Sequence, residues 1–528
     1  MKSWVLFIFI SPRKSYRVAP YGTSPFFAPP FFFHYLSCRI YDGRSMKRNL
    51  ILILVVFYIF NSSSMLAGTD QDDHNTLANT KFPVPIKEII AQFSLVNKNP
   101  NSFFIGLDQN TIVPPENNKK YFKPLWNITK FNLLIWAFDR YVLKGSWTNI
   151  SFQSVSDNIK TGLTWDYDDF GTNHFGHAYH GAMYHSISRS QGMSFLESSL
   201  YTFLGSLTWE FLWESEYPGK NDHYFSTFGG IHLGEALYRM ANLVSYENAT
   251  GFGRTLGKAF KFFVNPIVSI TGSSGENLDS GRFSKDHYYD FKLPLGAYHS
   301  SDDQFIMLIA TRFQYKDVFQ NDSSKIRPYD WFSFDARIGI SEQGFRDPEV
   351  STYGILFGKK FRNGCAGLFG LFDYINSHLA EQMSAVGFGP GFATSSSSES
   401  DLFLNTSGIL SFVFGSSSAT IAYSEPNFEK EGNEPYHFGP GILGKVKFEL
   451  GKKGLGSLYT GFSQYWVHAT LVDANEFMSV ISLDLNYDMS ERSQISLGYD
   501  YYLRNGRLED QRLTRSKNAV RAMYVLNF

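Results

Sequence analysis

The chain ends with the residues VRAMYVLNF, which occupy positions 520–528. Counted back from Phe528, every second side chain is apolar, at Leu526, Tyr524, Ala522 and Val520. A period of two is that of a β-strand, because successive side chains of a strand point to opposite faces. The segment therefore predicts a C-terminal strand with one apolar face, either in a soluble sheet or in the wall of a membrane barrel.

Composition favours the barrel. The 528 residues carry a formal net charge of −1, so bulk electrostatics gives no reason to expect a nucleic-acid partner. Aromatic residues make up 17% of the chain, yet its mean hydropathy is −0.20. After residue 60, no apolar run reaches the ~18 residues of a membrane helix. Many aromatic residues without overall hydrophobicity are typical of strands that alternate between lipid and lumen.

The period of two continues from about residue 303 to the C-terminus. In residues 442–450, for example, Ile442, Val446 and other apolar side chains alternate with Lys445, Lys447 and Glu449. A soluble sandwich also alternates, but its apolar faces are rarely this aromatic. We therefore expect a mainly β fold, in which residues 303–528 form an antiparallel transmembrane outer-membrane β-barrel of about 12 strands. The terminal aromatic resembles the assembly signal of such barrels, which predicts outer-membrane lipid and the barrel-assembly machinery as partners.

The N-terminal part contains an export signal. Residues 46–68 combine a basic start, an apolar stretch and a small-residue cleavage site, which is the pattern of a secretory signal peptide. We interpret residues 1–45 as a mis-assigned upstream extension, although a genuine long leader is the alternative. Residues 69–122 are polar and predict a periplasmic segment. Cys38 lies upstream of the signal, so the mature chain keeps only Cys365 and forms no internal disulfide.

Residues 123–270 differ from the rest in having helical character. Ser194 and Glu197 form the S-x-x-E pattern of a capping box, which predicts a helix from residue 194 to about 216. Pro218 and Gly219 end it, and a second helix follows from about 221 to 244. We expect this helical hairpin to pack in or against the periplasmic mouth of the barrel. Residues 150–170 have a strand-like pattern, and residues 271–302 and 387–401 read as long loops.

Residues 165–185 read WDYDDFGTNHFGHAYHGAMYH and concentrate histidine and aspartate. Imidazole and carboxylate groups are the ligands of zinc and of non-haem metals. The candidate metal ligands are His174, His177, His180, Asp166 and Asp168. The alternative is a polar turn at a barrel rim or in the lumen, where these side chains satisfy backbone groups.

The two helices of the hairpin carry charged residues between Leu, Phe and Trp, a sequence context in which we expect the charges to be buried. An unpaired charge in an apolar interior is costly, so these acids must meet a base or water. One hypothesis is a general acid/base site, and the other is a charge network that fastens a plug helix to polar lumen walls. The candidate catalytic residues are His180, Glu210, Glu214, Glu235 and Arg239. The sequence shows no phosphate-binding glycine loop and no G-x-S-x-G elbow, and we expect no cofactor.

Several segments of this region resemble a known family. They are Trp165–Phe170, His177–Gly181 (HAYHG), Gly205–Glu210 (GSLTWE), Asn221-Asp222 and Gly234–Arg239 (GEALYR). In this order they are similar to the domain of unknown function 3943 family of bacterial exported proteins, over roughly residues 125–270. Ala178 replaces the proline of the family pattern, and Gly219-Lys220 stands where a serine is expected. The resemblance implies no established activity, but it implies that these polar residues share one core.

Three functions remain open from the sequence. The first is a structural or transport barrel with a helical plug. The second is an outer-membrane enzyme that acts on lipid or glycan through the Glu/His cluster. The third is a surface binding protein that uses its long loops. All three place the protein in the bacterial outer membrane.

Overall fold

The computed structural model describes residues 120–166, 168–243, 251–271, 289–320, 326–342, 344–398, 400–417, 436–470, 473–508 and 511–528. The predicted upstream extension (1–45), the predicted signal peptide (46–68), nearly all of the predicted periplasmic segment (69–122) and residues 272–288 of the predicted loop lie outside these ranges.

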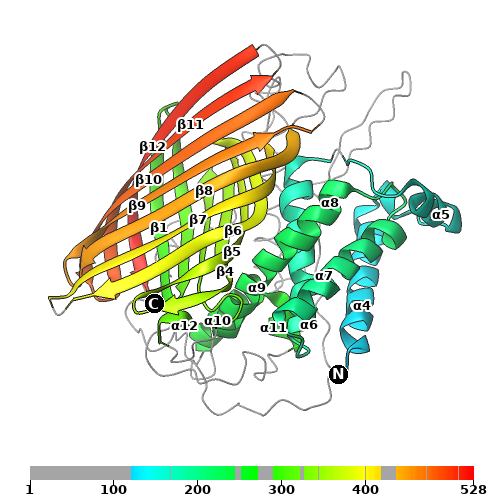
Figure 1. Ribbon diagram of the computed structural model, residues 1–528, viewed down its shortest axis with the longest axis horizontal. Helices are drawn as coiled ribbons and strands as arrows, with labels where there is room; N and C mark the ends of the chain where they lie inside the picture. Colours follow the sequence, from blue (N-terminus) through cyan, green and yellow to red (C-terminus); the bar gives the residue numbers. More distant parts are fainter. Residues whose placement is uncertain are drawn as a thin grey trace.

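The described C-terminal part forms a closed antiparallel barrel of twelve strands (Figure 1). Each strand pairs with its neighbours in the sequence, and β12 closes the barrel against β1. The predicted fold class and strand number are therefore confirmed. The strands are β1 (Tyr289–Ser300), β2 (Phe305–Tyr315), β3 (Phe332–Ser341), β4 (Gly344–Phe361), β5 (Gly364–Ser377), β6 (Glu381–Ser397), β7 (Leu402–Ser417), β8 (His437–Lys452), β9 (Gly456–His468), β10 (Ala474–Ser490), β11 (Ser493–Leu508) and β12 (Gln511–Asn527).

The C-terminal stretch forms the closing seam. Leu526 pairs with Leu293 and Tyr524 with Leu295 across the β1–β12 ladder. Phe528 follows the strand, donates its backbone N–H to the carbonyl of Phe291 at 3.0 Å, and stacks on the ring of Phe291. Closure leaves no open strand edge, so every strand of the barrel has two backbone partners.

Two segments that the sequence predicts to be loops are strands in the structure. β1 begins at Tyr289 inside the predicted loop 271–302, and β6 covers most of the predicted loop 387–401. Proline and glycine caused both errors, because they are usually turn signals. In β6, Gly387 and Gly389 occupy the inward positions, whereas Phe388 points outward and is half exposed. Small inward residues are compatible with a narrow barrel, so the glycines mark the lumen row and not a turn.

The two faces of the barrel wall belong to two separate hydrophobic clusters. Asp373 of β5 and its ladder partner Ala385 point inward, whereas the next residues, Phe372 and Val386, point outward. The inward side chains form one cluster that fills the lumen, including Tyr353, Phe369, Leu371, Met383, Tyr465 and Met478. The buried outward residues, from Phe291 of β1 to Phe438 of β8, belong to a second cluster, which they share with the N-terminal helices.

The N-terminal part is helical. Its elements are α4 (Phe122–Phe138), the π-helical turn η2 (Asp139–Leu143), the 3₁₀ turn η3 (Ser146–Thr148), α5 (Phe152–Thr161), the π turn η4 (Thr172–Gly176), α6 (His177–Arg189), α7 (Phe195–Thr208), the π turn η5 (Trp209–Trp213), α8 (Lys220–Tyr224), the π turn η6 (Phe225–Gly229), α9 (Gly230–Leu243), α10 (Gly251–Val264) and α11 (Pro266–Thr271); α12 (Asp317–Gln320) lies between β2 and β3. None of the described helices combines the length and apolar character needed to cross a bilayer.

The predicted helical hairpin is present. Ser194 caps α7 through the expected reciprocal bonds with Glu197, and the second helix runs from Lys220 through α8, η6 and α9. Residues 152–161, predicted to be strand-like, form α5 instead. There the Ser151 hydroxyl accepts the N–H of Ser154 at 3.0 Å, so a capping box of two serines starts a helix.

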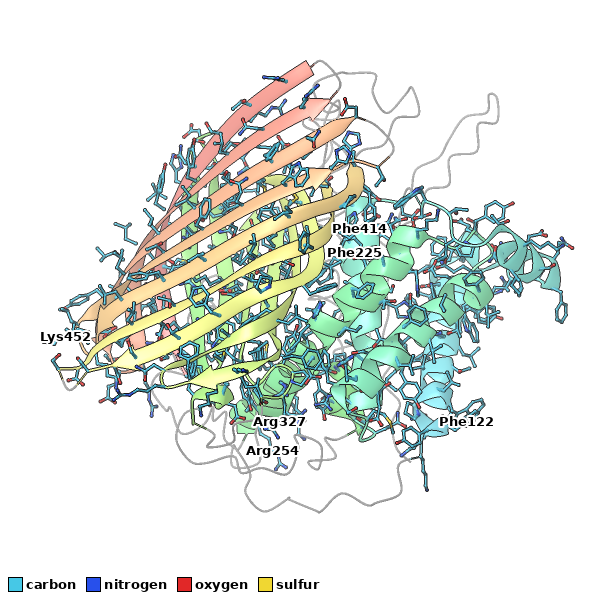
Figure 2. All side chains as sticks on the ribbon, in the orientation of Figure 1. Phe122, Phe225, Arg254, Arg327, Phe414 and Lys452 are labelled. Atoms are coloured by element: carbon cyan, nitrogen blue, oxygen red, sulfur yellow. The ribbon has the colours of Figure 1, made fainter. Side chains whose placement is uncertain are left out.

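The helices pack against the outer wall of the barrel, beside β4 to β8 (Figure 1). Tyr224 contacts Phe414 of β7 with ring centroids 4.6 Å apart, and Phe225 contacts Phe438 of β8 at 5.8 Å. Phe225 and Phe414 mark this contact in Figure 2, where the helices meet the barrel. A third aromatic contact joins the helical part to β5, where Phe170 stacks on Tyr374. These strand residues point outward. The hairpin expected in or against the periplasmic mouth is therefore present, and its aromatic residues contact the apolar outer face of the wall and not the charged lumen.

Glycines allow α6 and the second helix to approach closely. A Cβ on Gly181 would overlap the backbone carbonyl of Ser226, and a Cβ on Gly230 would lie 2.6 Å from the Cα of Gly181. Both backbones are helical, so no flexible side chain can move aside. The crossing of α6 with η6 and α9 therefore depends on the absence of these two side chains.

We expect the Gly181→Ala substitution to separate α6 from η6 and to destabilise the helices by roughly 1–3 kcal/mol, the usual cost of overpacking. Gly176→Ala is the matched control, because its Cβ would meet its nearest neighbour, the carbonyl of Gly171, at 3.7 Å. Pulse proteolysis of the detergent-solubilised protein measures the difference. Equal resistance of the two variants would show that the helices do not cross at Gly181.

Candidate functional site

The most concentrated group of metal-type ligands in the described residues lies inside the helical layer. It consists of His177 at the start of α6, Glu210 in η5 and Asp222 in α8. One nitrogen of the histidine and one oxygen of each acid lie within 4.8 Å of one another. All three side chains are buried, with exposed fractions of 6%, 1% and 1%. We call these three residues the His177 cluster.

Each member of the His177 cluster is oriented by a neighbour. The ring Nδ1 of His177 lies 3.2 Å from the hydroxyl of Ser226. The N–H of Gly219 donates to Oε2 of Glu210 at 2.9 Å, and the side-chain amide of Asn221 donates to Oδ1 of Asp222 at 3.3 Å. The other oxygens of the two acids face the imidazole, at 3.9 Å for Glu210 and 3.7 Å for Asp222.

Two further histidines line this region without joining the cluster. The ring of His174 is enclosed by Phe170, Phe225 and Tyr436, with centroids 4.4–5.0 Å away, and it is fully buried. His180 shares a hydrogen bond of 2.9 Å with the hydroxyl of Tyr184. Burial, assisted by the nearby His177, holds the pKa of both histidines well below the usual value, so both are neutral.

A second buried group, centred on Glu235 of α9, is an ion-pair network. Arg189 and Arg239 each place Nε 2.9 Å from this carboxylate, and Nε2 of His185 lies 3.0 Å from it. Burial alone would raise the pKa of Glu235, but the two guanidinium groups and the His185 hydrogen bond together lower it well below its ordinary value. Arg239 also donates to the carbonyl of Pro328 at 2.8 Å, so the network fastens α6 and α9 to the connection between β2 and β3.

The structure divides the residues predicted from the sequence between these groups. Of the five candidate catalytic residues, Glu210 belongs to the His177 cluster, Glu235 and Arg239 belong to the ion-pair network, Glu214 accepts a hydrogen bond from the indole of Trp209 at 2.6 Å, and His180 pairs with Tyr184. Of the candidate metal ligands, only His177 is part of the cluster. Asp166 and Asp168 instead lie in the bend before η4, where the Asp166 carboxylate accepts the N–H of Asp168 at 3.1 Å.

The sequence did not point to Asp222 as a neighbour of His177, nor to the helical state of residues 172–189. A polar turn was one of the two interpretations of this segment, but η4 and α6 make it helical. The π turns are the signal that spacing rules overlook. η4 precedes His177, η5 contains Glu210, and η6 follows Asp222. A π turn inserts one residue and rotates the side chains that follow, and such turns are frequent at functional sites.

The helices that hold both groups coincide with a known family. Residues 162–267 match the family model described as Domain of unknown function (DUF3943). The resemblance seen in the sequence is thereby confirmed. The DUF3943 segment runs from the end of α5 to the start of α11, so it contains the His177 cluster and the Arg189, Glu235 and Arg239 side chains of the network. No curated protein matches the chain.

Solved structures similar to this chain are barrels. An outer membrane channel from Pseudomonas putida has 9% sequence identity, covers 47% of this chain and 99% of its own, and gives a TM-score of 0.23. OmpT, an outer membrane protein of Vibrio cholerae, has 8% identity with 47% and 100% coverage and a TM-score of 0.17. The toluene transporter TodX from Pseudomonas putida has 9% identity with 46% and 90% coverage and a TM-score of 0.19. These similarities concern the barrel fold alone.

We expect Glu235→Gln to destabilise the DUF3943 helices by about 3–5 kcal/mol, because it leaves two buried guanidinium groups around a neutral amide. Asp157→Asn in α5 is the matched control. The ion pair between Asp157 and Lys160 is exposed, and its nitrogen–oxygen distance of 4.0 Å is long, so its loss should change stability little. Urea unfolding followed by tryptophan fluorescence in detergent compares them. Equal midpoints for the two variants would contradict a stabilising role for the network.

Stability of the helices should fall as the pH drops below about 6.5, the usual histidine pKa. Burial and the neighbouring His185 lower the pKa of His232 to about 3, so the folded state keeps this ring neutral while the unfolded chain takes up a proton. Each histidine that stays neutral in the folded state and is protonated in the unfolded chain lowers the free energy of unfolding by about 1.4 kcal/mol per pH unit below 6.5. We therefore expect His232→Phe to lose less stability than the wild type between pH 7 and pH 5. Identical pH slopes would show that His232 does not fold neutral.

Proposed function

We propose that this protein is an outer-membrane barrel that serves as a membrane anchor for its DUF3943 helices, with a lumen that ion pairs hold closed. The observation that carries the proposal is the contrast between the two faces of the wall. Outside the area covered by the helices, outward side chains are apolar and exposed, as with Phe412 (72%) and Leu485 (62%). A belt of this kind is stable against lipid and unstable against water.

The lumen is crossed by ion pairs between strands that are not neighbours. Lys445 of β8 lies 2.6 Å from Asp373 of β5, and Arg337 of β3 lies 2.9 Å from Asp500 of β11. Lys447 pairs with Asp335 in the same way between β8 and β3. These charged side chains face inward, and each pair bridges two separate parts of the wall. Such pairs reduce the space left for a solute, which supports the anchoring function.

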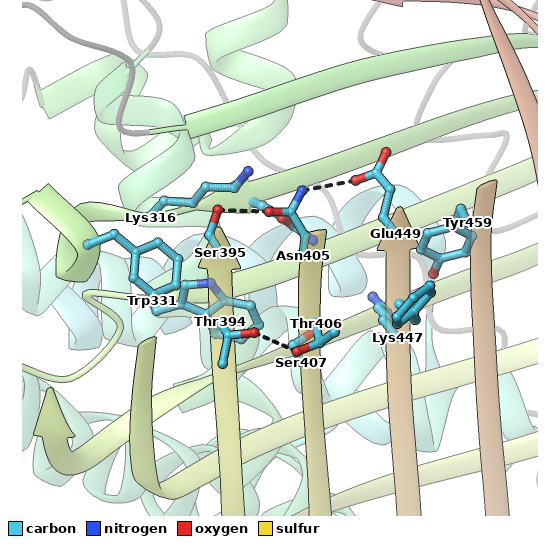
Figure 3. Close-up of a pocket in the computed structure, with 13 residues that line it drawn as sticks. Lys316, Trp331, Thr394, Ser395, Asn405, Thr406, Ser407, Lys447, Glu449 and Tyr459 are labelled. Carbon is cyan, nitrogen blue, oxygen red and sulfur yellow. Dashed lines mark hydrogen bonds between the residues drawn. The ribbon is translucent and has the colours of Figure 1, made fainter. Parts of the chain in front are cut away.

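The lumen nevertheless keeps a polar pocket near the ends of β6 to β9 (Figure 3). Lys447, Asn405 and Glu449 line it, and Asn405 donates a hydrogen bond to Glu449 at 3.3 Å. Transport of a small polar solute is the second candidate function, and the polar lining of this pocket is the observation that favours it. The pocket has a volume of about 10 Å³, which holds roughly one water molecule. Of the described helices, the short α12 reaches the lumen, where Val318 joins the inner cluster and Phe319 lines the pocket. The hairpin lies on the outer wall, so neither function uses it as the helical plug expected from the sequence.

The other functions considered from the sequence receive less support. The candidate acid/base residues are divided: Glu210 lies in the His177 cluster, Glu235 and Arg239 lie in the ion-pair network, and His180 and Glu214 belong to neither. Glu235 is also saturated by its ion pairs. For surface binding, residues 387–397 belong to β6, and residues 272–288 are outside the described part of the chain. Neither alternative is proposed.

Planar-bilayer recording of the refolded protein tests the closed lumen. We expect the wild type to insert without passing steady current. A fourfold variant that replaces Lys445, Asp373, Lys447 and Asp335 with alanine should show discrete conductance steps, because it removes both partners of two pairs and leaves no lone charge from either pair. Steady steps from the wild type would overturn the closed lumen and favour transport.

The matched control replaces Lys517 and Asp302, whose ion pair lies at the barrel rim and is about one-third exposed. This double alanine variant should insert and remain as silent as the wild type. If the fourfold variant inserts and stays silent as well, the cross-lumen pairs are not what closes the barrel.

A further inference from the structure

The His177 cluster brings together one imidazole and two carboxylates from three separate helical segments. Nε2 of His177 lies 3.7 Å from an oxygen of Asp222, and Nδ1 lies 3.9 Å from an oxygen of Glu210. One nitrogen of the ring and one oxygen of each acid all lie within 4.8 Å of one another. Metal–ligand bonds of about 2.0–2.2 Å place neighbouring ligands of a tetrahedral ion roughly 3.3–3.6 Å apart, so a small approach of the three side chains would let them share one ion.

The surrounding hydrogen bonds have the arrangement of a metal site's outer shell. In metal proteins, a ligating histidine shares its second nitrogen with a nearby acceptor or donor, and ligating carboxylates are hydrogen-bonded as well. Here Ser226, Gly219 and Asn221 engage one atom each of His177, Glu210 and Asp222. For both acids, it is the other oxygen that faces the imidazole.

The backbone around the cluster is shaped to keep the ligands close. A Cβ on Gly219 would overlap the carboxylate of Asp222, so only glycine allows the loop to donate its N–H to Glu210 beside this acid. The cluster also places two carboxylates at 1% exposure. A divalent ion bound at this point would offset the cost of burying two acids.

We propose that His177, Glu210 and Asp222 bind a divalent transition-metal ion. The mixed nitrogen and oxygen ligands suit Zn²⁺, Mn²⁺ or Fe²⁺, whereas Ca²⁺ and Mg²⁺ prefer oxygen alone and Cu⁺ prefers sulfur. This ligand set differs from the one predicted by sequence spacing, since it takes Glu210 and Asp222 in place of His174, His180, Asp166 and Asp168. The site lies in the DUF3943 helices and does not depend on whether the barrel conducts.

Zn²⁺ binding to the chelator-treated full-length protein in detergent tests the site. We expect about one ion per chain by equilibrium dialysis and metal analysis, and a visible absorption band when Co²⁺ replaces Zn²⁺. Glu210→Gln and Asp222→Asn should each weaken Zn²⁺ binding by more than tenfold. Ser226→Ala, which leaves all three ligands in place, should weaken it by about 10–100-fold, as outer-partner changes do.

Asp168→Asn is the matched control, because it removes an acid of the sequence-predicted set and leaves the cluster intact. It should bind Zn²⁺ as the wild type does. If a ligand variant fails to fold by circular dichroism, the comparison of Ser226→Ala with Asp168→Asn still decides the ligand set. Absence of Zn²⁺ and Co²⁺ binding by the folded wild type would overturn the proposal, as would equal weakening by Asp168→Asn and Asp222→Asn.

Discussion

The alternation of side chains along the barrel strands is the constraint on which the rest of the structure depends. A closed antiparallel barrel satisfies every strand through its neighbours, and each strand must then present one face to the lumen and one outward. In β5, this rule places Asp373 among the lumen charges and Phe372 against the helices. The lumen network, the lipid-facing belt and the docking surface for the helices all follow from the same period of two.

The helices adapt to that outer wall. Three aromatic side chains of the helices contact three aromatic side chains of the wall. The pairs are Phe170 with Tyr374, Tyr224 with Phe414, and Phe225 with Phe438. Aromatic pairs of this kind add to the stability that burial of their area provides. Behind this contact, the helices hold their charged residues in two internal groups. The barrel thus provides a platform, and the DUF3943 segment carries the candidate chemistry.

The barrel could be predicted from the sequence, because the period of two is local and repeats through residues 442–450, 477–487 and 520–528. The helical hairpin could be predicted as well, since Ser194, Glu197 and Pro218 mark its ends. The docking surface could not, because outward apolar residues look alike whether they meet lipid or a helix. Nor could the His177 cluster, whose members lie 33 and 12 positions apart in the chain, on helical segments that π turns interrupt. Inward glycines such as Gly387 led to a wrong prediction, because glycine usually indicates a turn and here occupies a strand.

Thiol crosslinking in a background without Cys38 and Cys365 tests most directly whether the helices lie on the outer wall. Tyr224 and Phe414 have ring centroids 4.6 Å apart, and the next residue of the strand, Val413, belongs to the cluster inside the lumen. We expect a short bifunctional maleimide to join Tyr224→Cys to Phe414→Cys, and not to join Tyr224→Cys to Val413→Cys. Crosslinking to position 413 and not to 414 would contradict this expectation, because the helices would then occupy the lumen.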